Sequence, residues 1–157
     1  MHVLRAFTLA AAAVSTVGAI AVACSDNNST GIPAGLEVYT ADLNGANERP
    51  TAVTSTAKAH AIITVLGTQI SWQVEITSAI DSVIAGHIHR GIADSAGGVV
   101  QSLSPTATGL AFTGIVANGS ATPPDSVIAL MRAGKAYVNI HTKAHTAGEI
   151  RGQLVKQ

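Results

Sequence analysis

The sequence predicts an all-β domain, an antiparallel β-sandwich or barrel of about seven strands with one short helix. Two observations carry this prediction. Several short segments rich in Val, Ile and Thr alternate between apolar and polar residues, which is the period of a half-buried strand. Residues that favour turns, such as Gly, Pro, Asn and Ser, separate these segments.

Seven segments are the expected strands. In residues 69–77 (QISWQVEIT), Ile70, Trp72, Val74 and Ile76 alternate with polar residues, which predicts one buried and one exposed face. The short connection at residues 66–68 (LGT) suits a hairpin between this segment and the preceding one. In chain order, the expected strands span residues 36–43, 57–65, 69–77, 82–89, 110–117, 135–142 and 149–155.

A short helix is expected between the fifth and sixth strands. Residues 123–134 (PPDSVIALMRAG) open with a candidate N-cap and close on Gly134. Val127, Ile128, Leu130 and Met131 give the segment an apolar face. We expect this face to pack on the core, where Met131 fills space.

The N-terminal residues 1–23 have the features of an export signal, because Arg5 precedes an Ala-rich apolar run that ends in small residues. Thr8 and Ser15 dilute this run, whose length is marginal for a membrane span of about 20 residues. The only cysteine, Cys24, follows directly, and the segment resembles the lipobox of bacterial lipoproteins. That resemblance implies cleavage before Cys24 and a lipid on its thiol. Ordinary secretory cleavage around Ala23 is the alternative.

Residues 24–35 (CSDNNSTGIPAG) read as a polar tether without a periodic apolar face. Residues 36–157 then form one domain, large enough to bury a core. A multiply acylated Cys24 would hold that domain firmly at the membrane. The expected location is the cell envelope, lipid-anchored and extracytoplasmic. With ordinary cleavage, the protein would instead be soluble and secreted or periplasmic.

The charge balance excludes a nucleic-acid partner. Lys and Arg together number 9, as do Asp and Glu, and no run of like charge occurs. Aromatic residues make up only 3% of the chain, too few for the stacking platforms that single-stranded nucleic acid favours.

Two histidine-bearing segments, residues 86–91 (GHIHRG) and 137–152 (YVNIHTKAHTAGEIRG), hold most of the unusual chemistry. In a strand, residues two apart share a face, so His87 and His89 project together. The same rule groups Asn139 with His141, and Glu149 with Arg151. A hairpin through the turn between these two pairs would bring Asn139 close to Arg151.

Four segments resemble the ordered motifs of the CHRD domain, first named in chordin. They are residues 43–50 (LNGANERP), 87–89 (HIH), 133–142 (AGKAYVNIHT) and 148–154 (GEIRGQL). The resemblance covers the predicted domain and implies an extracytoplasmic β-domain. In chordin such domains belong to an extracellular antagonist of growth-factor signalling, whereas bacterial members are mostly exported proteins of unassigned biochemistry. The resemblance therefore implies a location and a fold but no activity.

One hypothesis for the histidines is a metal site. Two imidazoles on one strand face, at His87 and His89, have a spacing that suits Zn or Cu. His141 is the expected third ligand, and His145 or His60 are weaker candidates. The pattern is similar to the His-x-His copper ligands of Cu/Zn superoxide dismutases, which also use a β-sandwich.

The other hypothesis is a buried network that fixes loops at one end of the domain. It would join the histidines to Asn139, Glu149 and Arg151 through hydrogen bonds and ion pairs. Glu149 and Arg151 are expected to pair with each other, because Arg matches carboxylates in a fork geometry. His60 is expected to be an ordinary strand residue.

Signatures of the common enzyme families are absent, with no phosphate loop, no His-Glu-x-x-His helix and no nucleophile elbow, so no catalytic residue is assigned. Two functions remain. One is a membrane-tethered binding or structural module of the cell envelope, with an unknown protein or envelope ligand as its partner. The other is a domain that binds Cu or Zn and has a potential redox role.

Overall fold

The computed structural model describes residues 33–157. The predicted signal segment, Cys24 and all but the end of the predicted tether lie outside the described residues. Within residues 33–157, no helix combines the length and the apolar character that crossing a membrane requires.

The described residues form a curled antiparallel sheet, which confirms the all-β prediction. Eight of its nine strands follow the order β5-β4-β7-β8-β1-β2-β3-β6, and the ninth, β9, pairs with β1 beside this path. The 3-10 turn η1 (Gly45–Asn47) and the helix α1 (Asp125–Arg132) complete the described elements. The strands are β1 (Leu36–Asn44), β2 (Lys58–Leu66), β3 (Gln69–Ile80), β4 (Val83–Arg90), β5 (Val99–Ser102), β6 (Phe112–Ala121), β7 (Ala136–Thr142), β8 (Ile150–Gln153) and β9 (Val155–Lys156).

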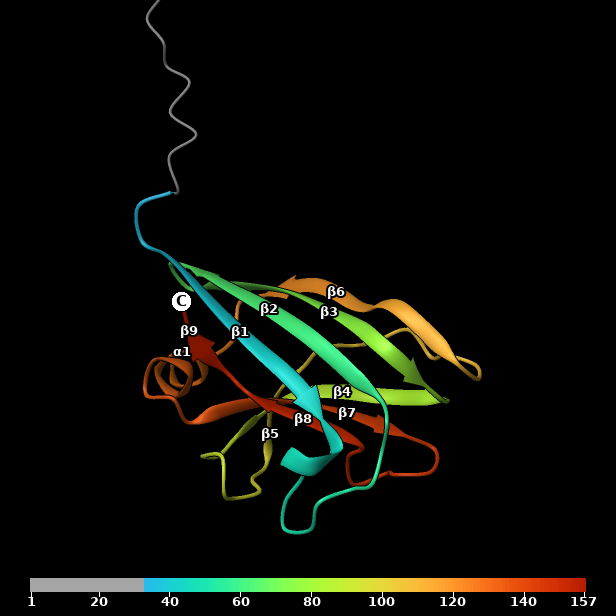
Figure 1. Ribbon diagram of the computed structural model, residues 1–157. Helices are drawn as coiled ribbons and strands as arrows, with labels where there is room; N and C mark the ends of the chain where they lie inside the picture. Colours follow the sequence, from blue (N-terminus) through green and yellow to red (C-terminus); the bar gives the residue numbers. More distant parts are fainter. Residues whose placement is uncertain (1–32) are drawn as a thin grey trace, which may run out of the picture. The chain divides into compact units, whose positions relative to one another are not determined.

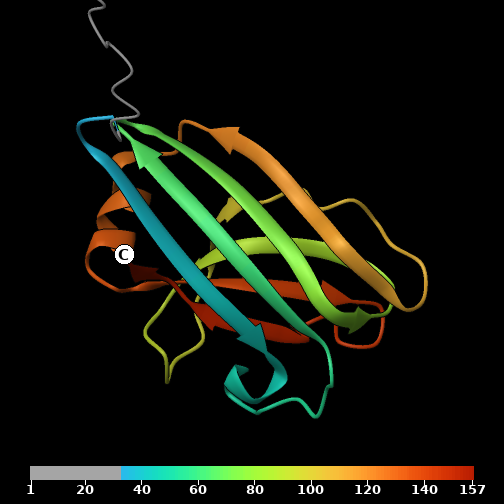
Figure 2. The ribbon, with the colours of Figure 1, turned by 45° about the horizontal axis from the view of Figure 1, so that its top comes forward.

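The sheet folds over on itself at the junction of β1 and β8. These two strands share a single register pair, Asn44 with Arg151, whereas β1 pairs with β2 along its whole length. As a result β1, β2, β3 and β6 lie over β4, β5, β7 and β8, and the two layers enclose the core (Figure 1). Figure 2 shows the long upper strands crossing the lower ones at an angle.

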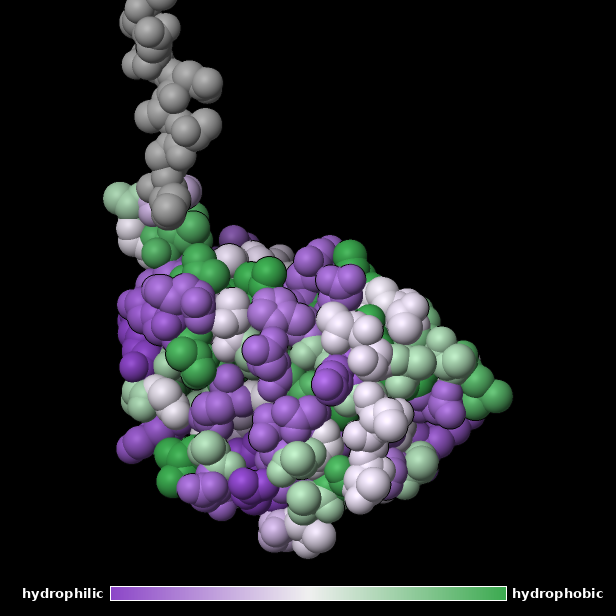
Figure 3. All heavy atoms as spheres, in the orientation of Figure 1, coloured by the Kyte–Doolittle hydropathy of each residue, from purple (hydrophilic) through white to green (hydrophobic). Residues whose placement is uncertain are grey.

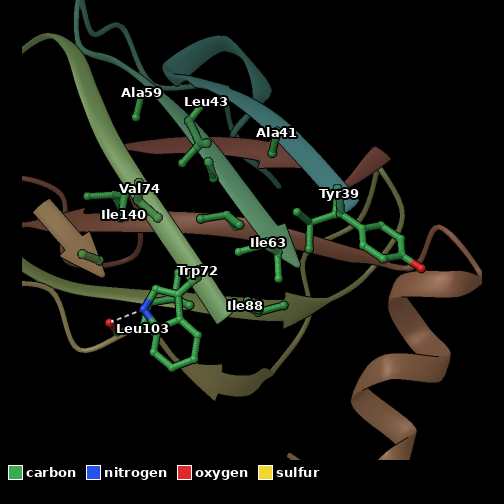
Figure 4. Packing of buried hydrophobic residues seen from close by; sticks show 14 of the residues in the cluster. Tyr39, Ala41, Leu43, Ala59, Ile63, Trp72, Val74, Ile88, Leu103 and Ile140 are labelled. Atoms are coloured by element: carbon green, nitrogen blue, oxygen red, sulfur yellow. Dashed lines mark hydrogen bonds between the residues drawn. The ribbon is translucent and has the colours of Figure 1, made fainter. Parts of the chain in front are cut away.

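The alternation of β3 has the predicted consequence. Ile70, Trp72, Val74 and Ile76 are all at most 7% exposed and belong to the hydrophobic core. Figure 4 shows Trp72 and Val74 in the space between the layers. Burying each such aliphatic side chain contributes about 1.5–3 kcal/mol. The indole Nε1 of Trp72 donates to the carbonyl of Leu103 at 3.1 Å, which ties β3 to the segment that follows β5.

Two strands differ from the predicted set. The short strand β5 was not predicted, because its four residues (VVQS) do not alternate between apolar and polar side chains. Its pairing with β4 is irregular as well. The last predicted strand is divided into β8 and β9. At the division, the N–H of the buried Leu154 donates to Ala136 in β7, and the chain then crosses to pair with β1.

The helix α1 lies within the predicted segment and buries Val127, Ile128 and Met131. It ends where Gly134 adopts a positive φ of 66°, a conformation that glycine reaches without a steric cost. Arg132 in its last turn and Lys156 in β9 both bond the carboxylate of Glu37 in β1, at 2.5 and 2.8 Å. Arg132, with help from Lys156, holds the pKa of Glu37 at about 2.

The face of the molecule seen in Figure 1 mixes hydrophilic and hydrophobic residues, as Figure 3 shows, and its most apolar end is the tip where β3 ends and β6 begins. Leu110 in the loop before β6 is 78% exposed. The polar site described next lies instead on the outer face of the lower layer, beneath loops.

Candidate metal centre

The strand β7 is buried on both of its faces, although only one of them meets the hydrophobic core. Val138 and Ile140 belong to the hydrophobic core, where Figure 4 shows Ile140 among its neighbours. The alternate residues Tyr137, Asn139 and His141 point outward, yet each of them is at most 7% exposed. The outer face of this strand therefore carries a buried polar layer, which is the usual signature of a functional or network site.

Loops from three parts of the chain cover this polar layer. Asn47 in η1 donates from its side chain to the carbonyl of Arg151 at 3.2 Å, and Ser55 donates to the Glu149 carboxylate at 2.7 Å. In the loop after β4, the N–H of Gly97 donates to the Tyr137 hydroxyl at 3.1 Å. The loop after β7 closes the layer at Gly148, where a Cβ would lie 2.5 Å from the Asn139 side chain.

Beneath these loops, the structure brings His87, His89 and His141 together, as the metal hypothesis requires. The register pairs His87 with Asn139, and His89 with Tyr137, so the three imidazoles gather on two neighbouring strands. One nitrogen from each ring can be chosen so that all three lie within 4.8 Å of one another. The ring centroids are 4.9–5.7 Å apart.

The loop carbonyls determine which nitrogens face the cluster. The Nδ1–H of His89 donates to Gly97 O at 2.9 Å, and the Nδ1–H of His141 donates to Thr146 O at 3.0 Å. Both rings are therefore oriented with Nε2 free of a proton. Such bonds from the outer nitrogen to a carbonyl are the usual support of histidine ligands in metal sites.

The Nε2 atoms of His89 and His141 differ in their hydrogen-bond partners. Nε2 of His141 lies 3.1 Å from Nδ1 of His87, which can donate to it. Nε2 of His89 is buried and has no hydrogen-bond partner among the described residues. Burial lowers the pKa of all three histidines, and the neighbouring imidazoles lower the pKa of His87 further. The rings are therefore neutral at pH 7, as metal ligands must be.

The residues present fit a borderline metal ion. Imidazole nitrogen suits both Zn and Cu, and three protein ligands with an open fourth position form a frequent zinc arrangement. Bonds of about 2.0–2.1 Å around a tetrahedral ion place ligand nitrogens about 3.4 Å apart. The limit of 4.8 Å for the cluster exceeds this by about 1.4 Å, a difference that side-chain rotation can close.

The weaker ligand candidates lie elsewhere. His145 does not belong to the cluster, and its main chain instead closes the turn after β7, through its N–H to Thr142 Oγ1 and its carbonyl to Gly148. His60 lies in β2, where its Nδ1 is 2.7 Å from the Asp42 carboxylate. It is thus a strand residue, as expected.

A stack of side chains links the cluster to the rest of the polar layer. The ring of His89 stacks on Tyr137 with centroids 5.0 Å apart, and the guanidinium carbon of Arg151 lies 3.5 Å from the same ring centroid. Because β4 and β8 flank β7 on opposite sides, His89 and Arg151 sandwich Tyr137. Arg151 is 1% exposed, and burial lowers its pKa.

The predicted pairing of Glu149 with Arg151 is wrong. Glu149 precedes β8 and accepts hydrogen bonds from Thr142 and Ser55, at 2.6 and 2.7 Å. The long side chain of Arg151 crosses Tyr137 and donates from Nη2 to the carbonyls of Ile92 and Ser95. Both residues hold loops, as the network hypothesis expects, but they hold different ones. The expected proximity of Asn139 and Arg151 is confirmed by their register pairing.

One buried acid was missed by the sequence interpretation. Glu48 is 4% exposed and accepts a hydrogen bond from the Asn139 side chain at 3.3 Å. Burial raises its pKa to about 7. Glu48 lies in residues 43–50, the first of the four segments that resemble CHRD motifs. The resemblance singled out this segment but did not show that Glu48 lies against β7.

Comparison with known proteins gives one family. The family model of the CHRD domain matches residues 39–154. The comparison with curated proteins gave no match, and the comparison with solved structures gave none either. The matched residues run from β1 to the end of β8 and include the histidine cluster together with the loops that cover it. This chain therefore belongs to the CHRD domain family, whose members are typically extracellular β-domains.

Proposed function

We propose that this CHRD domain binds a single transition-metal ion, Cu or Zn, through His87, His89 and His141. Nε2 of His89 and Nε2 of His141 are the ligand atoms that the loop carbonyls leave available. His87 supplies the third nitrogen, through the Nδ1 atom that faces His141. With three protein ligands the ion keeps an open position, which a small ligand of the envelope can occupy.

The unpartnered Nε2 of His89 is the observation that carries this proposal. A buried nitrogen acceptor without a partner costs about 1–3 kcal/mol, so a purely structural histidine would be expected to use both of its nitrogens. Here the atom lies among two other neutral imidazoles and no carboxylate or thiol joins the cluster within residues 33–157. A metal ion satisfies all three rings at once.

A structural role is the competing function, and one contact favours it. The His87–His141 hydrogen bond of 3.1 Å joins β4 to β7 without a metal. Under this alternative the domain is a binding or structural module of the envelope, and the histidines only hold its loops. The wild-type protein would then hold only background metal. Substituting the histidines would lower the free energy of unfolding and leave this metal content unchanged.

Metal content distinguishes the two functions. Purified protein incubated with Zn²⁺ or Cu²⁺ and freed of excess ion should retain about one ion per chain of at least one of these metals. His87→Ala and His89→Ala should each reduce retention to background. Loading should also raise the thermal midpoint, because an ion bound only by the folded state adds about 4 kcal/mol at a thousandfold excess over Kd.

His60→Ala is the matched control, since it removes an imidazole from β2 outside the cluster. His145→Ala tests the weaker ligand in the same way, and both variants should retain the ion. Background metal in the wild-type protein after incubation with each ion would contradict the proposal. The proposal would also be contradicted if His60→Ala and His89→Ala lost the same amount of bound metal.

We further propose that the domain is exported and held at the membrane by lipid on Cys24, with residues 24–35 as its tether. Two observations support this proposal: the segment before Cys24 resembles a lipobox, and CHRD domains are typically extracellular. Mass spectrometry of the mature protein should then find an N-terminal Cys24 that carries acyl chains. A mature protein whose Cys24 has a free thiol, or that begins beyond Cys24, would contradict lipidation.

A further inference from the structure

A small polar pocket lies on the far side of Tyr137 from the histidine cluster. It has a volume of about 110 Å³ and is lined by Asn47, Arg49, Ala93, Arg151 and Gln153. Space of this size holds several water molecules or one small oxyanion. The lining residues come from the η1 region, the loop after β4 and the strand β8, which are fixed to each other by the hydrogen bonds described above.

The charge of the pocket is positive and is poorly compensated. Arg151 forms no salt bridge with any described carboxylate, although a buried charge ordinarily requires a partner. The Arg49 guanidinium donates to the carbonyls of Ala46 and Glu48 and lies 3.5 Å from Asp94, an acid whose side chain is 86% exposed. The Glu48 carboxyl is bonded to Asn139 and makes no salt bridge with either arginine.

Two lining side chains each keep one buried polar atom without a partner in the described chain. One is Nη1 of Arg151, a donor, and the other is Oε1 of Gln153, an acceptor. The neighbouring atoms are already engaged, since Nη2 of Arg151 bonds two carbonyls and Nε2 of Gln153 bonds three. A ligand that satisfies both atoms must carry an acceptor and a donor.

We propose that this pocket binds a small oxyanion that bears a hydroxyl group, such as hydrogenphosphate or hydrogencarbonate. The anionic oxygens accept from Arg151 and Arg49, whose planar guanidinium groups match such oxygens. The hydroxyl donates to Oε1 of Gln153. Sulfate at neutral pH has the size and the charge of the phosphate ion but no hydroxyl, so it leaves this acceptor unsatisfied.

Titration of the metal-free protein with phosphate, hydrogencarbonate and sulfate tests the proposal. Nitrogen–proton NMR resonances of the Arg151 guanidinium and isothermal calorimetry report binding. We expect saturable binding of phosphate or hydrogencarbonate, at least about tenfold tighter than sulfate, a factor that corresponds to about 1.4 kcal/mol. Because metal-free protein is used, failure of this proposal is distinguishable from failure of the metal site.

Variants at the rim of the pocket locate the binding. Arg49→Gln should weaken phosphate binding at least about tenfold, whereas Lys58→Gln, the same loss of charge at an exposed position of β2, should leave it unchanged. Ala93→Leu fills the pocket without removing a charge and should also weaken binding. Asp94→Asn removes the competing carboxylate and should strengthen it.

No saturable binding of either hydroxyl-bearing anion would overturn the proposal. Binding of sulfate as tight as that of phosphate would overturn the assigned role of Gln153 and with it the ligand class. Unchanged phosphate affinity in a folded Ala93→Leu protein, checked by its thermal midpoint, would place the binding elsewhere and overturn the site.

Discussion

Arg151→Ala is expected to lower the free energy of unfolding by about 3–5 kcal/mol. The substitution removes a fully buried side chain, its hydrogen bonds to Ile92 and Ser95, and its contact with the Tyr137 ring. Bonds from a charged donor contribute about 1.5–3 kcal/mol each, and the contact with the ring adds to them. For a domain of this size the thermal midpoint should fall by about 10 °C or more.

The comparison that makes this result specific is Arg151→Lys. Lysine keeps the charge but lacks the planar guanidinium group that lies over the Tyr137 ring, so it should recover less than half of the loss. Lys58→Ala, at an exposed position, should change stability by no more than about 0.5 kcal/mol. Chemical denaturation measures all three. A loss for Arg151→Ala as small as that for Lys58→Ala would contradict the central role assigned to Arg151.

Glu48→Gln is expected to stabilise the protein above pH 7 and to flatten its pH dependence. Burial raises the pKa of Glu48 from 4.5 to about 7, so the folded state binds this proton more tightly than the unfolded state does. The stability that the neutral carboxyl provides is complete below pH 4.5 and is lost as the pH rises through about 7. The loss amounts to at most about 3 kcal/mol. Glutamine keeps the shape and the hydrogen-bonding oxygen without the charge.

Denaturation at several pH values measures this effect as the difference between wild type and variant. The difference isolates Glu48 from other groups, such as Glu37, whose low pKa of about 2 places its contribution at pH values below 4.5. Glu75→Gln, on the exposed face of β3, is the matched control. If Glu48→Gln leaves the slope between pH 4.5 and 7 as steep as Glu75→Gln does, Glu48 is not a neutral buried acid.

Much of the fold could be predicted because most of its strands have a recognisable pattern in their own local sequence. Ile70, Trp72, Val74 and Ile76 alternate with polar residues in a regular β3, and Gly134 ends a helix that begins at a Pro-Pro pair. The strand β5 could not be predicted, since it owes its existence to pairing with β4 and not to a pattern of its own. The chain is divided into β8 and β9 because it crosses from pairing with β7 to pairing with β1. This change of partner depends on tertiary structure and not on local sequence.

The candidate site was predictable where strand geometry decides it. The rule that alternate residues share a face correctly places His87 with His89 and Asn139 beside Arg151. It could not reveal that loops bury this face, because the loop contacts join residues far apart in sequence. Glu48 and Ser55 therefore went unnoticed, and Arg151 was paired with Glu149 when it in fact reaches the loop after β4.

The central claim is that three imidazoles hold one metal ion beneath the loops. X-ray absorption spectroscopy at the Zn or Cu edge of the loaded protein tests it most directly. We expect scattering from three imidazole rings at about 2.0–2.1 Å and a weaker, exchangeable contribution from the open position. His89→Ala should remove one ring from this shell or leave no bound metal to measure. A spectrum without imidazole scattering, or one that His89→Ala leaves unchanged, would contradict the assignment of His87, His89 and His141 as a metal centre.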